Sequence, residues 1–94
     1  MFTRPDPNLI VSDAGFSVEA LGRTGLLYKE GDHVMNVGSE FGPPGLGITV
    51  WAKTIRAWRA PYAEEPVTDE VRELILRNIA EVVEFTKQPL TILR

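Results

Sequence analysis

The 94-residue sequence contains no cysteine. This absence excludes disulfide bonds, thiolate nucleophiles and thiolate metal ligands. Long apolar runs are also missing, because no run exceeds three residues, whereas a transmembrane helix needs about 20. The first residues include Pro5 and Pro7 and have no apolar run of the kind found in a signal peptide. We therefore expect a soluble, cytoplasmic protein without a membrane partner.

An excess of basic residues is lacking as well. The sequence has 10 Lys and Arg against 13 Asp and Glu, for a net charge of −3. A nucleic-acid-binding protein neutralises phosphates with lysine and arginine. The charge balance therefore argues against a nucleic-acid partner and is compatible with a basic protein partner.

Residues suited to catalysis are few. His33 is the sole histidine and follows Asp32 at an expected turn, but neighbouring residues of a strand point to opposite faces, so this pair is not expected to form. The carboxylates show no spacing typical of a calcium loop. We predict that the protein is not an enzyme and holds neither a metal nor a cofactor.

A single stretch is rich in glycine, at residues 42–47. A phosphate-binding loop works through a row of backbone amides, and the adjacent Pro43 and Pro44 remove two of them. The stretch also lacks the Gly-Lys-Ser/Thr ending of such loops. We interpret it as a rigid structural loop.

One long helix is expected over residues 68–87. Its apolar residues recur with the 3.6-residue period of a helix: Val71, Leu74, Ile75, Ile79, Val82 and Val83. Thr68 is a suitable N-cap, because its hydroxyl can accept a hydrogen bond from a free amide of the first turn. Pro89 cannot donate a backbone hydrogen bond and restricts the residue before it, so the helix should end near Lys87.

Short β-branched and aromatic runs separated by turn residues predict the strands. They lie at 9–11, 16–21, 26–30, 33–37, 48–52 and, after the helix, 90–93. We expect an α+β fold in which an antiparallel meander of five to six strands packs on one long C-terminal helix, followed by a short closing strand. Residues 1–8 are expected to form a loose tail, and residues 9–94 a single domain.

The segment that begins at the end of the fifth expected strand carries aromatic and basic residues typical of binding hot spots. If Ile48 and Val50 face the helix, Trp51 faces the opposite side of the sheet. A tryptophan in that position is either covered by a loop or offered to a partner, and the sequence leaves both alternatives open. The candidate partner-binding residues in this segment are Trp51, Arg56, Trp58, Arg59 and Tyr62.

Acidic residues cluster next to this segment. Five of them occur within ten positions, against the single base Arg72: Glu64, Glu65, Asp69, Glu70 and Glu73. Such a cluster is either a solvated helix start with favourable dipole interactions or a negative surface for a basic partner. We add these five residues to the candidate partner-binding set.

Several residues occur in an order similar to that of a known family. They are Tyr28-Lys29-Glu30-Gly31, Ile48 to Val50, Ile55-Arg56-Ala57-Trp58 with Pro61, Glu65-Pro66, and Ile75 to Ile79 with Asn78. This order resembles the immunity protein 74 family, small α+β proteins proposed to neutralise bacterial polymorphic toxins. The resemblance implies a non-enzymatic inhibitor whose partner is a cognate protein toxin.

Two alternatives remain. The first is a small ligand-binding or enzymatic domain with a pocket between the 42–47 loop and Trp51. The second is a homo-oligomeric structural module, for instance a homodimer, that buries the tryptophan face. A large toxin-like gene immediately upstream would favour the immunity function over both.

Overall fold

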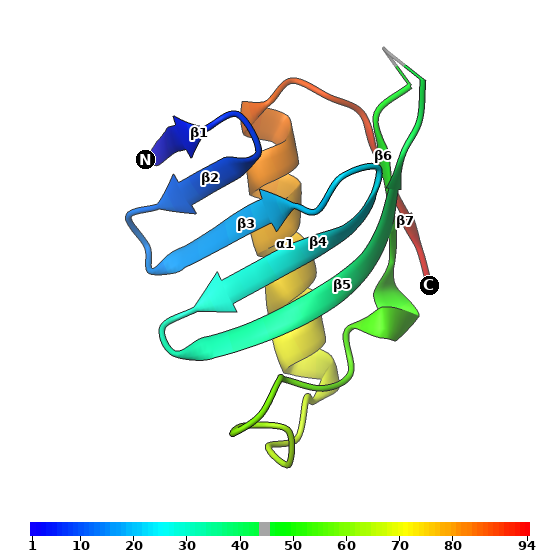
Figure 1. Cartoon of the computed structure of the whole chain (residues 1–94). Helices are drawn as coiled ribbons and strands as arrows, with labels where there is room; N and C mark the ends of the chain where they lie inside the picture. The colour runs from blue at the N-terminus through cyan, green and yellow to red at the C-terminus, as the bar shows by residue number, and fades with distance from the viewer. Residues whose placement is uncertain (44–45) are drawn as a thin grey trace.

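A computed structural model describes residues 1–43 and 46–94, and Figure 1 shows its course. The strands and helices, in chain order, are β1 (Phe2–Asp6), β2 (Leu9–Ser12), β3 (Phe16–Ala20), β4 (Thr24–Glu30), β5 (His33–Phe41), β6 (Ile48–Trp51), the short 3₁₀ helix η1 (Ala52–Thr54), α1 (Asp69–Phe85) and β7 (Leu90–Leu93). Part of the 42–47 loop, for which we predicted a rigid structure, lies outside the described residues.

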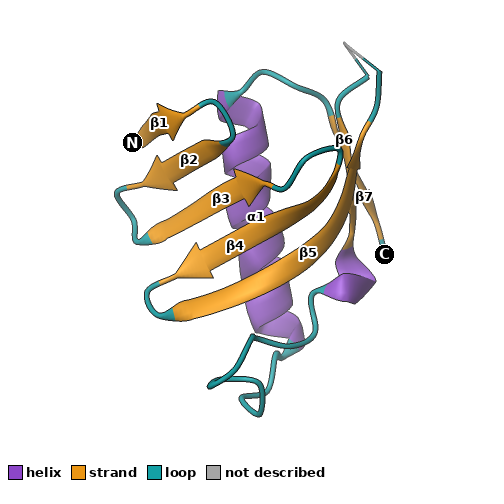
Figure 2. Cartoon of the chain, in the orientation of Figure 1, coloured by secondary structure: helices purple, strands orange, loops and turns teal. Residues whose placement is uncertain are grey.

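All seven strands form one sheet whose spatial order is the order of the chain, β1 to β7. Neighbouring strands are antiparallel up to β6, whereas β7 runs parallel to β6. Helix α1 connects β6 to β7 and carries the chain back to the end of the sheet at which β6 begins. Strand β7 therefore runs in the same direction as β6. Figure 2 shows α1 crossing one face of the sheet. The predicted α+β fold is confirmed.

The expectation of a loose tail at residues 1–8 was wrong. Phe2–Asp6 forms the edge strand β1, which pairs with β2. Proline is tolerated at such an edge because the missing amide would face away from the sheet. An aromatic anchor holds the strand, since the ring of Phe2 lies 6.2 Å from that of Phe16 and 5.4 Å from that of Phe85.

Helix α1 begins as predicted. Thr68 is its N-cap, and the backbone N–H of Val71 donates to the Thr68 hydroxyl at 3.2 Å. The helix ends at Phe85, two residues before the expected end at Lys87. Lys87 itself has a φ of 61°, in the left-handed region, so the chain has already left the helical conformation. No helix among the described residues is long and apolar enough to cross a membrane.

The buried face of α1 is rotated slightly from the predicted stripe. Ile75, Ile79, Val82 and Val83 are buried as expected, but Leu74 is 38% exposed. Leu76, which the pattern left out, is 2% exposed. At 100° per residue these two positions flank the stripe on opposite sides, and the sheet covers the side of Leu76.

A polar network crosses the core between helix and sheet. The side-chain amide of Asn78 donates to the hydroxyl of Tyr28 at 2.9 Å, and that hydroxyl donates to a carboxylate oxygen of Glu30 at 2.6 Å. Burial, reinforced by the hydrogen bond to Glu30, raises the pKa of the Tyr28 phenol far above its usual value. The hydroxyl therefore stays protonated and fixes the position of α1 over β4.

Removing the Tyr28 hydroxyl is expected to destabilise the protein. In Tyr28→Phe the buried amide of Asn78 loses its acceptor, which typically costs about 1–3 kcal/mol. Ser39→Ala is the matched control, because the Ser39 hydroxyl is also buried but has no hydrogen-bond partner among the described residues. Urea unfolding should show a loss for Tyr28→Phe and none for Ser39→Ala. Equal effects would contradict the role of the network.

Candidate functional site

The segment between β6 and α1 covers an edge of β5. Strand β6 pairs only with Ser39–Phe41, so the first half of β5 has β4 on one side and no strand of the described residues on the other. The segment supplies hydrogen bonds in its place. The N–H of Arg59 donates to the carbonyl of Val34 at 2.8 Å, and the N–H of Gly38 donates to the hydroxyl of Thr54 at 2.7 Å. The first half of the segment is thereby attached to the sheet.

His33 holds the middle of this segment. Its ring stacks on that of Tyr62, with centroids 3.8 Å apart and planes 13° from parallel. A hydrogen bond of 2.8 Å joins its Nε2 to a carboxylate oxygen of Glu65. His33 thus contacts a carboxylate 32 positions away rather than pairing with Asp32, and no local sequence pattern indicates this contact. We refer to residues 56–66 as the acidic loop, after Glu64 and Glu65, although it also contains Arg56 and Arg59.

Trp58 faces the core and is removed from the candidate partner-binding set. It is 8% exposed, and its ring lies 6.3 Å from Tyr28 and 5.0 Å from His33. Ile55, three residues earlier, is fully buried. These two side chains attach the segment to the core, so Trp58 cannot serve as an anchor for a partner without local unfolding.

Trp51 lies on the sheet face opposite α1. Ile48 and Val50 are buried beneath the helix, and Trp51 alternates with them and is partly buried. Across the sheet it pairs with Leu93 of β7, which is 46% exposed. α1 lies on the other face of the sheet (Figure 2), so the long helix does not cover Trp51.

The two candidate arginines of the acidic loop are both exposed. Arg59 is fixed in place, because its Nε donates to the side-chain oxygen of Asn36 at 2.6 Å. Asn36 belongs to β5 and points to the same sheet face as Trp51. Arg56 lies three residues earlier in the loop.

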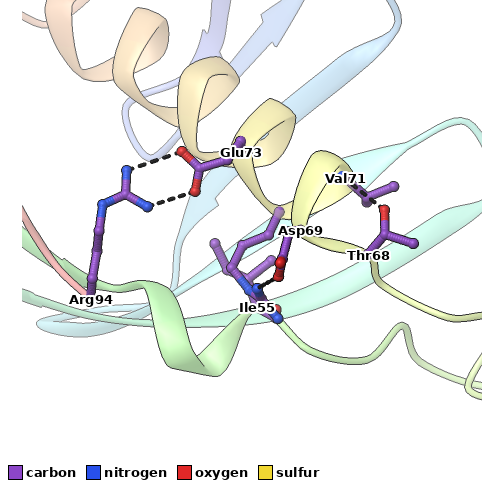
Figure 3. A network of polar contacts seen from close by, with 7 residues as sticks. Ile55, Thr68, Asp69, Val71, Glu73 and Arg94 are labelled. Carbon is purple, nitrogen blue, oxygen red and sulfur yellow. Dashed lines mark hydrogen bonds and ion pairs between the residues drawn. The ribbon is translucent and has the colours of Figure 1, made fainter.

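The acidic residues divide into two groups. Figure 3 shows Glu73 accepting two hydrogen bonds from Arg94, at 2.6 and 3.1 Å. Asp69 accepts one from Arg72 at 2.6 Å, and Arg72 also donates to the carbonyl of Ile55 at 3.0 Å. The pairing of Glu73 with Arg94 links α1 to the residue after β7, and Arg72 links α1 to Ile55. Asp69 pairs only within the helix, and part of the charge of both acids is neutralised.

The Glu73–Arg94 pair has a consequence for acid stability. The hydrogen bond from Arg94 holds the pKa of the Glu73 carboxyl below its usual value of 4.5. A carboxyl with a lowered pKa in the folded state stabilises the fold above its unfolded pKa, and this contribution is lost as the pH falls through the folded value. The pair is exposed, so its contribution is small.

The second group of acids forms no ion pair with a lysine or arginine among the described residues. Glu64 and Glu70 are exposed, and the Glu65 side chain is 51% exposed although it binds His33. Tyr62 stacks on His33 and is partly exposed. The acidic loop thus presents a tyrosine among carboxylates on a segment whose conformation is fixed by the sheet.

Other candidate chemistry is limited in the described part of the chain. Residues 1–43 and 46–94 contain no group of three or more His, Asp or Glu placed to hold a metal ion. A hollow does lie beside the 42–47 loop, but its walls come from that loop, Phe41 and residues 87–89. Trp51 is not among the described residues that form its walls, and the hollow faces the connection from α1 to β7.

Comparison with known proteins identifies one family. The sequence model of immunity protein 74 matches residues 18–92, from β3 to β7. No curated protein and no solved structure matches the chain. Three of the residues on which the resemblance was based lie together in the core, since Tyr28 bonds Asn78 and packs near Trp58. They support the fold rather than a binding surface.

Proposed function

Because the chain belongs to the immunity protein 74 family, we propose that it protects a bacterial cell by binding and neutralising a cognate protein toxin. It acts in the cytoplasm, as a stoichiometric inhibitor and not as an enzyme. The match to the family over residues 18–92 is the observation that carries this proposal. A polymorphic toxin system would supply the partner from a neighbouring gene.

The surface proposed to contact the toxin combines the acidic loop with the start of α1 and Trp51. Its members are Trp51, Arg56, Arg59, Tyr62, Glu64, Glu65 and Glu70, with Asp69 and Glu73 at the rim. Hydrogen bonds that Arg59 donates to Val34 and Asn36, together with the bond between His33 and Glu65, fix the loop before any partner arrives. A segment that is ordered in advance loses less conformational entropy on binding, which favours high affinity.

The exposed carboxylates indicate the character of the partner. Charge complementarity increases the rate of association and selects among partners. Glu64, Glu65 and Glu70 would therefore face a basic surface of the toxin, while Trp51 and Tyr62 supply apolar contact area. This arrangement gives no role to nucleic acid or membrane.

Coexpression tests the proposal. The gene immediately upstream is expressed in a susceptible strain with and without this chain, and cell survival is counted. We expect survival only with the chain present, and we expect the two proteins to copurify as a complex. A chain that is well folded but neither protects the cells nor binds the upstream product would refute the immunity function. Binding to itself alone, through the tryptophan face, would favour the homodimer alternative.

A further inference from the structure

A cavity opens at the end of α1 that is far from the acidic loop. Its volume is about 160 Å³, whereas protein interiors rarely contain voids larger than a water molecule. It lies between the last turns of α1 and strands β2 to β6. Its apolar walls are formed by Ile10, Val18, Ala20, Leu26, Phe41, Ile48, Val82 and Val83. A dry apolar cavity of about 150 Å³ can hold a benzene ring.

The mouth of the cavity is polar and carries one positive charge. Arg4, Asn8 and Gln88 line it, and Arg4 is the single ionisable residue among the described residues that do so. The Nε and one Nη of Arg4 donate to the carbonyl of Pro7, at 3.0 and 2.7 Å. The guanidinium is thus held at the turn between β1 and β2, at the edge of the opening. Lys87 lines the adjoining hollow and adds a second positive charge nearby.

The geometry points to a ligand site that goes beyond the immunity function: we propose that this cavity binds a small aromatic carboxylate. The ring occupies the space between α1 and the sheet, where it contacts Val18 and Val83. The carboxylate remains at the mouth, where it accepts a charge-assisted hydrogen bond from Arg4. Small-ligand sites commonly combine apolar walls with a few placed polar groups in this way.

Benzoate is the probe that tests this proposal. We expect its titration to give saturable amide chemical-shift changes at residues such as Ile10, Val18 and Val83. The melting temperature should rise with the concentration of benzoate. Ala20→Leu, or the milder Ala20→Val, places a larger side chain in the cavity and should abolish these changes in a folded protein. Changes that persist in both folded variants would show that benzoate binds elsewhere.

The role of the charge is tested separately. Arg4→Gln should weaken benzoate binding roughly fivefold or more and leave the binding of neutral benzyl alcohol unchanged. Arg77→Gln, which removes an exposed arginine from α1, is the matched control and should change neither. Equal binding of benzoate and benzyl alcohol to the parent protein would overturn the carboxylate assignment. The absence of saturable binding to the parent would overturn the site, and neither result bears on toxin neutralisation.

Discussion

Replacing Ile79 with alanine is expected to lower the free energy of unfolding by roughly 2–5 kcal/mol. Ile79 is fully buried where α1 crosses the sheet, in one core cluster with Tyr28, Met35 and Val50. The substitution removes apolar contacts and leaves a cavity that the surrounding strands can fill only partly. Because a domain of this size has a total stability of about 5–15 kcal/mol, the loss is a large fraction of it.

Leu74→Ala is the control for this substitution. It removes a residue of similar size from the same helix, but Leu74 is 38% exposed and lies outside the buried face. Its cost should stay below about 1 kcal/mol. Urea unfolding followed by circular dichroism measures both variants. Similar losses for the two would mean that α1 packs on the sheet through a different face.

Truncating Trp51 is expected to weaken toxin binding by at least about 2 kcal/mol, mainly through faster dissociation. Aromatic anchors in the centre of an interface commonly have this effect, and Trp51 is a partly buried tryptophan on the sheet face opposite α1. The double variant Glu64→Lys with Glu70→Lys should instead slow association and weaken its dependence on salt. Glu65 is left in place because its loss would also release His33.

Two controls separate these effects from damage to the fold. Glu81→Lys reverses an exposed charge nearer the C-terminal end of α1 and should leave both rate constants unchanged. Each variant must melt like the parent before its kinetics are interpreted. If folded Trp51→Ala and Glu64→Lys/Glu70→Lys both bind like the parent, the interface lies elsewhere on the molecule.

The sequence allowed most of the fold to be predicted because its apolar residues repeat with clear periods. Period 3.6 located α1, and the hydroxyl of Thr68 indicated its first turn. The failure at β1 has a physical reason. Two prolines and no alternation are typical of a loop, whereas the strand is held by the ring of Phe2 against Phe16 and Phe85, which lie far away in the sequence.

The candidate site was harder to predict because its contacts join distant parts of the chain. The sequence shows where the acidic residues cluster, but not which of them form ion pairs within the protein. Glu73 is bound by Arg94, 21 positions later, and only the pairing of β7 with β6 brings that arginine near α1. Likewise the orientation of Trp58 depends on Tyr28 and His33. A tryptophan in an irregular segment gives no periodicity from which its burial can be inferred.

The central claim is that this chain neutralises a toxin by binding it, and a titration of toxin activity tests that claim most directly. Purified toxin from the upstream gene is held at a fixed concentration well above the dissociation constant, and the chain is added in increasing amounts. We predict that activity falls linearly and reaches its minimum near one equivalent. Complete loss of activity at a small fraction of an equivalent would show catalysis instead, and full activity at an excess of folded chain would show that the two proteins are not partners.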